Sequence, residues 1–133
     1  MAAVVDTDVF SFVFKKDTRK SLYEPHLAGQ FLFLSFITLG ELHQWDLSGG
    51  WGDRRRMQLA QLLRRYSIQH STPAICELWA EVTDEGRRQG KPVAVGDAWI
   101  AATALFLNLP LISHNASDFK GISGLTLITE NIK

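Results

Sequence analysis

Short apolar segments alternate along this chain with longer segments that carry apolar residues every three or four positions. The short segments are rich in β-branched and aromatic residues and are bounded by Gly, Pro, Asp or Asn, which predicts strands. We expect five strands: Ala2–Val5, Phe31–Phe36, Tyr66–Gln69, Leu111–Ser113 and Leu125–Ile128. The longer segments predict helices with one apolar face. These are Asp17–Ala28, Thr38–Leu47, Asp53–Arg65, Pro73–Gln89 and Asp97–Leu107.

Residues at the ends of the predicted helices support these boundaries. Thr72 is placed to cap the helix that Pro73 opens, and Gly90 is placed to end it. Alternating strands and helices predict a parallel sheet with helices on both faces. We therefore expect an α/β fold, a three-layer α/β/α sandwich with a mainly parallel five-stranded sheet, that spans residues 1–133 as a single domain.

The composition says more about the cellular compartment of the protein than about its activity. The chain has 14 basic and 14 acidic residues, so its net charge neither favours nor excludes a nucleic-acid partner. Its one cysteine, Cys76, has no partner for an internal disulfide, and we expect it to be a small buried residue. We see no signal-peptide core and no run of about 18 apolar residues. These features predict a cytoplasmic protein with no membrane partner.

Four acidic residues lie where a parallel α/β sheet binds ligands. Asp6, Glu41, Asp97 and Asp118 are each expected to follow a strand within a few residues, at the carboxyl edge of the sheet. Several carboxylates gathered there would repel one another unless cations neutralised them. Carboxylate oxygens without sulfur or nitrogen ligands suit Mg²⁺ or Mn²⁺ better than zinc.

Each acid also has a structural interpretation. Glu41 follows Thr38 at the spacing of a capping box, and Asp97 would favour the start of a helix electrostatically. Asp118 lies in a segment typical of turns, and Asp8 is placed to cap a short helix over 9–14. No single acid decides between structure and function, but the joint placement of the four favours a shared site.

Four parts of the sequence together resemble a known family. They are VVDTD at 4–8, Glu41 after Thr38, GDAWIAATA at 96–104 and SHNASDF at 113–119. In this order and spacing the chain resembles the PIN-domain ribonucleases, and most closely the VapC-type toxins of toxin–antitoxin pairs. The resemblance runs from the first predicted strand to Gly124 and Leu125.

The resemblance implies a metal-dependent endoribonuclease in which Asp6, Glu41, Asp97 and Asp118 hold Mg²⁺ or Mn²⁺. It implies that water activated by the metal attacks the RNA phosphate and leaves a 5′-phosphate and a 3′-hydroxyl. Asn115 and Thr7 are expected to orient a carboxylate or the phosphate. The family also implies a cognate antitoxin protein and a homodimer as partners.

Basic residues are locally concentrated although the total charge is balanced. Arg54–Arg56 and Arg64–Arg65 fall on one predicted helix, and Arg87, Arg88 and Lys91 precede Asp97. Such runs are more often solvated helix faces than RNA contacts, and the group before Asp97 is the better candidate for phosphate binding.

Two other functions remain open on the residues alone. Asp6 and Asp8 also match the Asp-x-Asp loop of haloacid-dehalogenase-like phosphatases, in which Asp6 would be the nucleophile. Such an enzyme needs a further acid after Gly96-Asp97, at a position where this chain has Ala101. Alternatively, the fold is a catalytically silent binding module whose acids serve as caps and turns.

Overall fold

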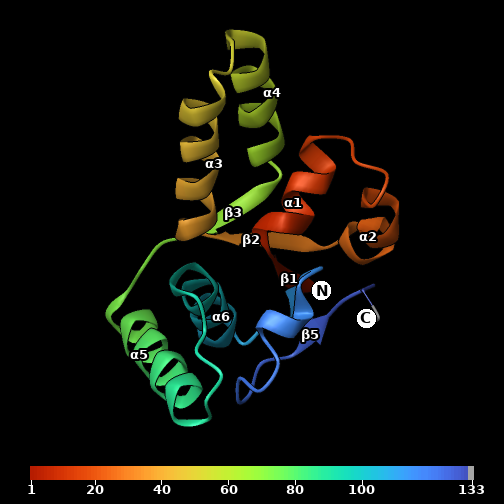
Figure 1. The fold of residues 1–133 in the computed structure, drawn as a ribbon. Coiled ribbons are helices and arrows are strands. Elements are labelled where there is room, and N and C mark those ends of the chain that lie inside the picture. The colour runs from red at the N-terminus through yellow and green to blue at the C-terminus, as the bar shows by residue number, and fades with distance from the viewer. Residues whose placement is uncertain (132–133) are drawn as a thin grey trace.

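Five parallel strands form the centre of the computed structural model, which describes residues 1–131 (Figure 1). The strands are β1 (Ala2–Val5), β2 (Phe31–Ser35), β3 (Tyr66–Gln69), β4 (Leu111–Ile112) and β5 (Leu127–Ile128). Their order across the sheet is β3-β2-β1-β4-β5, and every neighbouring pair is parallel. The order reverses at β1, so β1 and β4 flank the switch point beside which α/β folds bind ligands.

Helices cover both faces of the sheet. They are α1 (Thr7–Phe14), α2 (Lys20–Leu27), α3 (Phe36–Gly49), α4 (Asp53–Leu63), α5 (Pro73–Arg88) and α6 (Val95–Leu107), with a 3₁₀ turn, η1, at Ala116–Asp118. In Figure 1, α1 to α4 lie on one side of the strands, and α5 and α6 lie on the other. The predicted three-layer sandwich is therefore confirmed.

The alternation of side chains along β1 creates two cores. Ala3 and Val5 pack into the core under α1 to α4, whereas Val4 packs into the core under α5 and α6. Strand β4 divides in the same way, with Ile112 in the first core and Leu111 in the second. All of these residues are almost fully buried, and each large apolar side chain contributes about 1.5–3 kcal/mol.

Several predicted boundaries were wrong by three residues or fewer, and two of these differences have identifiable reasons. The second strand ends at Ser35 rather than Phe36 because the Ser35 hydroxyl caps α3 by accepting from the Ile37 N–H at 3.4 Å. The first predicted helix begins at Lys20 rather than Asp17 because Lys16 has a positive φ of 55° and Asp17 accepts from the backbone of Arg19 in a turn.

The last two strands are shorter than predicted. Leu125 does not join β5, because its N–H bonds back to the Ile122 carbonyl in a turn that Gly124 allows with a φ of +80°. Strand β4 is assigned over two residues, although the Ser113 N–H still reaches the Ile128 carbonyl at 3.0 Å. The predicted strand positions were otherwise right.

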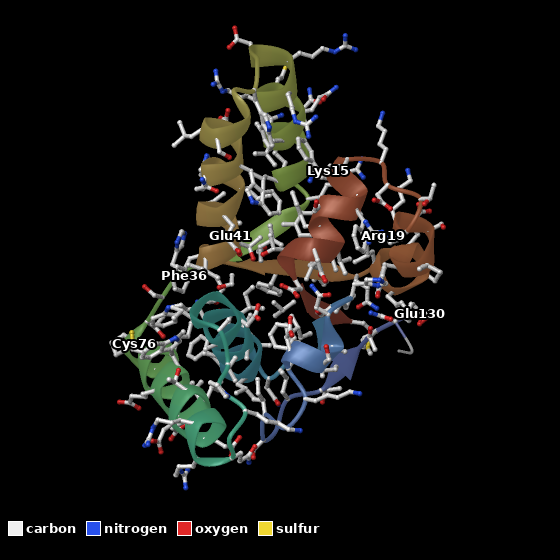
Figure 2. The ribbon with its side chains drawn as sticks, in the orientation of Figure 1. Lys15, Arg19, Phe36, Glu41, Cys76 and Glu130 are labelled. Atoms are coloured by element: carbon white, nitrogen blue, oxygen red, sulfur yellow. The ribbon has the colours of Figure 1, made fainter. Side chains whose placement is uncertain are left out.

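The expectation for Cys76 was wrong. Its thiol is exposed on α5, and Figure 2 shows the residue at the outer edge of the molecule. The buried positions of α5 include Ile75 and Val82, and Cys76 directly follows Ile75 on the helix. No helix within residues 1–131 is long and apolar enough to span a membrane.

Candidate active site

A hollow of about 190 Å³ is formed beside the carboxyl ends of the strands. Four of its lining residues are acidic, and the full lining is Asp6, Thr7, Asp8, Glu41, Trp45, Asp97, Ile100 and Asn115. Three of the four predicted acids therefore share this hollow. The fourth, Asp118, lines an adjoining hollow, and Asp97 belongs to the walls of both.

Asp6 is the most deeply placed of the acids. It follows β1 directly, caps α1, and has only 5% of its surface exposed. One carboxylate oxygen accepts from the Thr7 N–H at 2.8 Å, and the other accepts from the Ser113 hydroxyl at 2.7 Å. Burial, and next the charge of Asp8, raise the pKa of Asp6 to about 8. The carboxylate is thus held in one orientation but lacks a neutralising charge.

The element that carries Asp97 differs from the one predicted. We expected it to follow a strand, but it lies in the first turn of α6, which follows α5 and a short loop. Burial raises the pKa of Asp97 to about 6, and the charges of Asp118 and Glu41 add to this effect. Asp97 therefore lies close enough to both Glu41 and Asp118 to be repelled by their charges, although Asp118 lines the second hollow.

Glu41 is held by a hydrogen bond from across the site. The Thr7 hydroxyl donates to Glu41 Oε1 at 2.9 Å and shares a second hydrogen bond with the Thr38 hydroxyl at 2.8 Å. The capping-box interpretation was wrong, because α3 begins at Phe36 and is capped by Ser35. Figure 2 shows Glu41 on the part of α3 nearest the sheet.

Asp8 belongs to the site and was missed from the sequence. One of its oxygens accepts from the Val9 N–H at 2.6 Å, and the other accepts from the N–H groups of His114 and Asn115 at 3.1 Å each. The expectation that Asp8 caps a helix over 9–14 was wrong, because α1 begins at Thr7 and Asp6 caps it. Burial raises the pKa of Asp8. Its position two residues after Asp6 was the available signal, and the helix-cap interpretation obscured it.

Asn115 and Asp118 lie on the segment that follows β4. The Asn115 N–H is shared between Asp8 and the Ser113 hydroxyl, which lies 3.1 Å away. The Asn115 side chain is exposed at the rim of the acidic hollow. Asp118 ends η1 and is also exposed. Asp8 and Ser113 therefore hold the backbone that presents both residues.

The chemistry of this side-chain set suits a hard divalent cation. The hollow presents four carboxylates and an amide, and its lining has no basic residue to balance them. Among residues 1–131, no three acidic, histidine or cysteine side chains are arranged so that they could together hold a metal ion. Burial is the main cause of the raised pKa values of Asp6 and Asp97, and repulsion from neighbouring carboxylates adds to it; a cation bound between the carboxylates would offset both effects.

Comparison with known proteins matches this arrangement to a family. A sequence model of the PIN domain matches residues 3–125, which includes all of the acids discussed above. This chain belongs to the PIN-domain family. PIN-domain ribonucleases use divalent metal ions, which agrees with the oxygen-rich lining of the hollow.

Similar proteins of known name have nearly the same length as this PIN domain. Ribonuclease VapC4 of Mycobacterium tuberculosis is 31% identical over 130 residues, which cover 96% of this chain and 95% of that protein. Ribonuclease VapC1 of Haemophilus influenzae is 28% identical over 131 residues, which cover 94% of this chain and 95% of that protein. The predicted resemblance to VapC-type ribonucleases is confirmed.

Solved structures agree with the fold of this PIN domain. The structure of VapBC-1 from nontypeable Haemophilus influenzae matches with a TM-score of 0.83 and 27% identity over 97% of this chain and 98% of that one. VapBC2 from Rickettsia felis, bound to a promoter DNA fragment, matches in fold with a TM-score of 0.85 at 22% identity, over 97% and 98% of the two chains. The phosphatase and binding-module alternatives find no support in these matches. The position at which the phosphatase needs an acid is the buried Ala101.

Proposed function

We propose that this PIN domain is the endoribonuclease toxin of a toxin–antitoxin pair and that Asp6, Glu41, Asp97 and Asp118 hold its Mg²⁺ or Mn²⁺. The observation that carries the proposal is the crowding of carboxylates in a hollow without a basic side chain, in a chain similar throughout to ribonucleases named VapC. Oxygen-only ligands favour Mg²⁺ or Mn²⁺ over zinc.

The chain's own residues would keep the carboxylates in place. Ser113 and the Thr7 N–H fix both oxygens of Asp6, and the Thr7 hydroxyl fixes one oxygen of Glu41. One oxygen of Glu41 is left for a ligand. A divalent cation bound here would supply an activated water molecule and stabilise charge on the phosphate. The exposed amide of Asn115, at the rim, is placed to donate to a phosphate oxygen.

The partners follow from the same family. The neighbouring structures from Haemophilus influenzae and Rickettsia felis are complexes named VapBC. We propose a cognate antitoxin that masks the acidic hollow, a homodimer as the working assembly, and the cytoplasm as the compartment in which cellular RNA is cut. Co-expression with any short reading frame that adjoins the gene, followed by co-purification, tests the proposed antitoxin.

The decisive experiment is cleavage of a mixed cellular RNA pool by the purified protein with Mg²⁺, with Mn²⁺ and with EDTA. The variant Asp97→Asn keeps the side-chain shape and removes one carboxylate, and Asp84→Asn is its control on the exposed surface of α5. We expect metal-dependent cuts with 5′-phosphates from the wild type and Asp84→Asn, and none from Asp97→Asn. Equal cleavage by Asp97→Asn would refute the proposed site, and intact RNA in every reaction would refute the nuclease.

A further inference from the structure

A second hollow of about 470 Å³ adjoins the acidic one, and Asp97 lies in the wall between them. It is formed by two segments: the loop before α6, with Lys91, Pro92, Val93 and Ala94, and the turn after β4, with Ser117, Asp118 and Lys120. In Figure 1 the connection from α5 to α6 lies beside the blue segment that follows β4. An extended ligand that leaves the acidic hollow past Asp97 would enter this second hollow.

The backbone of Lys91 is fixed against α5. Its N–H donates to the Gly86 carbonyl at 2.9 Å, and a Cβ placed on Gly86 would come within 2.8 Å of the Lys91 carbonyl oxygen. Only glycine at position 86 allows this close approach without a shift of the loop. The Lys91 side chain is therefore presented from a rigid base rather than from a loose loop.

Lys120 is presented from the other segment that lines this hollow, and its backbone is also held in place. It follows Phe119, whose ring is 1% exposed in the core under α5 and α6 and whose N–H bonds to the Ala116 carbonyl at 3.0 Å. Both lysine side chains are exposed. Two positive charges from segments far apart in the sequence thus line the same hollow.

Several other basic residues already have partners. Arg56 pairs with Asp46 at 2.9 Å, and Arg87 and Arg88 both pair with Asp84. Arg55 lies 4.6 Å from the ring of Trp51, and Lys15 lies 5.1 Å from that of Trp45. Within residues 1–131, neither Lys91 nor Lys120 has an ion pair or a ring contact. Their charges remain available to a ligand.

We propose that Lys91 and Lys120 bind the phosphate next to the scissile one, so that single-stranded RNA crosses Asp97 from the acidic hollow into the second hollow. The inference rests on the proposed ribonuclease function. The acidic hollow has no basic side chain, so metal ions must balance the scissile phosphate there, whereas the neighbouring phosphate needs cations supplied by the protein. The two lysines are the basic residues in the adjoining wall.

Binding without cleavage is the first test. A short fluorescent RNA that spans a cleavage site mapped in the cellular pool is titrated in EDTA against wild type, Lys91→Gln, Lys120→Gln, the double variant and Arg87→Gln. Arg87→Gln removes the same charge from an exposed position that lines neither hollow. We expect the double variant to bind about tenfold more weakly and the salt slope to fall by about 0.7 per lysine, with Arg87→Gln unchanged.

The second test neutralises the phosphate instead of the lysines. Methylphosphonate linkages are placed one at a time on each side of the cleaved bond. We expect a methylphosphonate at one of the flanking positions to weaken cleavage by the wild type. The same linkage should have no further effect on the double lysine variant, because that variant already lacks the contact between the lysines and the flanking phosphate. The inference would be overturned if the losses from the methylphosphonate and from the lysine substitutions were independent and additive. It would also be overturned if the lysine variants bound the RNA as tightly as the wild type.

The metal site provides a separate readout. Stabilisation by Mn²⁺ is expected to be at least as large in the double lysine variant as in the wild type. All four carboxylates that we assign to the metal remain, and two positive charges are removed from the hollow that Asp97 and Asp118 line. If wild-type protein cuts RNA and the lysine variants match it, only this inference fails. If wild-type protein neither cuts RNA nor responds to Mn²⁺, the proposed function fails with it.

Discussion

The hydroxyl of Tyr23 lies 2.6 Å from Nδ1 of His114, and this contact joins α2 to the segment that carries the acidic hollow's rim. The same hydroxyl accepts from the Glu130 N–H at 3.1 Å, so its own hydrogen is available to His114. The backbone N–H of His114 in turn donates to the Asp8 carboxylate. His114 is therefore a structural link between a buried tyrosine and the acids.

Replacement of Tyr23 by Phe tests this link. Tyr23 is fully buried, so loss of its hydroxyl leaves His114 Nδ1 and the Glu130 N–H without a partner. We expect the free energy of unfolding to fall by about 1–3 kcal/mol, measured by urea denaturation. The control is Tyr66→Phe, because the Tyr66 hydroxyl has no hydrogen bond within residues 1–131. Equal stability of the two variants would contradict the assignment.

Asp8 is predicted to act on stability rather than on metal binding alone. Both of its oxygens accept backbone N–H groups, and an asparagine has only one acceptor oxygen. Asp8→Asn should therefore lower the free energy of unfolding by about 1–3 kcal/mol in EDTA. Asp97→Asn has no such hydrogen bonds to lose and relieves repulsion, so it should be at least as stable as wild type under the same conditions. The opposite order would refute these roles.

The raised pKa of Asp97 predicts how stability depends on pH without metal. Its carboxyl has a pKa of about 6 when folded, against 3.8 as the ordinary value, so the unfolded chain loses this proton first as the pH rises. The resulting stability is present below pH 3.8 and is lost as the pH rises through 6. In EDTA, the free energy of unfolding of the wild type should therefore fall relative to that of Asp97→Asn as the pH rises from about 3.8 to about 6. A difference independent of pH would count against the raised pKa.

Mn²⁺ should reverse this trend, because the cation competes with the proton on the carboxylate. Its apparent affinity is expected to rise with pH through 6, and the pKa of about 8 at Asp6 extends the increase toward pH 8. The shift in melting temperature on adding Mn²⁺, measured over this range, reports it. A shift of constant size would show that neither carboxyl is coupled to the ion.

Two glycine substitutions should have opposite effects on stability. Gly86→Ala places a Cβ 2.8 Å from the Lys91 carbonyl oxygen and 3.1 Å from a methyl group of Val93, and should cost about 1–3 kcal/mol by overpacking. Gly40→Ala, within α3, meets nothing within 4 Å and should stabilise the protein by about 0.5–1 kcal/mol. Thermal unfolding of both variants checks the prediction, and a neutral Gly86→Ala would show that the loop holding Lys91 yields easily.

Much of the fold could be predicted from local pattern. The five strands were placed within two residues because their apolar segments are short and sharply bounded. Thr72 caps α5 as expected, with its hydroxyl 3.1 Å from the Ile75 N–H. Gly90, expected to end this helix, follows its last residues with a left-handed φ of 72°. These features depend on neighbours in sequence, which is why they could be predicted.

The sequence by itself therefore determined the layers of this protein and the placement of Asp6 directly after a buried strand. Only the tertiary structure decided that Glu41 is held by Thr7 across 34 residues, that Asp8 binds the backbone of His114 and Asn115, and that Cys76 faces solvent. The physical reason is the separation along the sequence over which each interaction acts. Hydrophobic period and capping act within a few residues, whereas hydrogen bonds and charge repulsion between distant segments exist only after the sheet has brought those segments together.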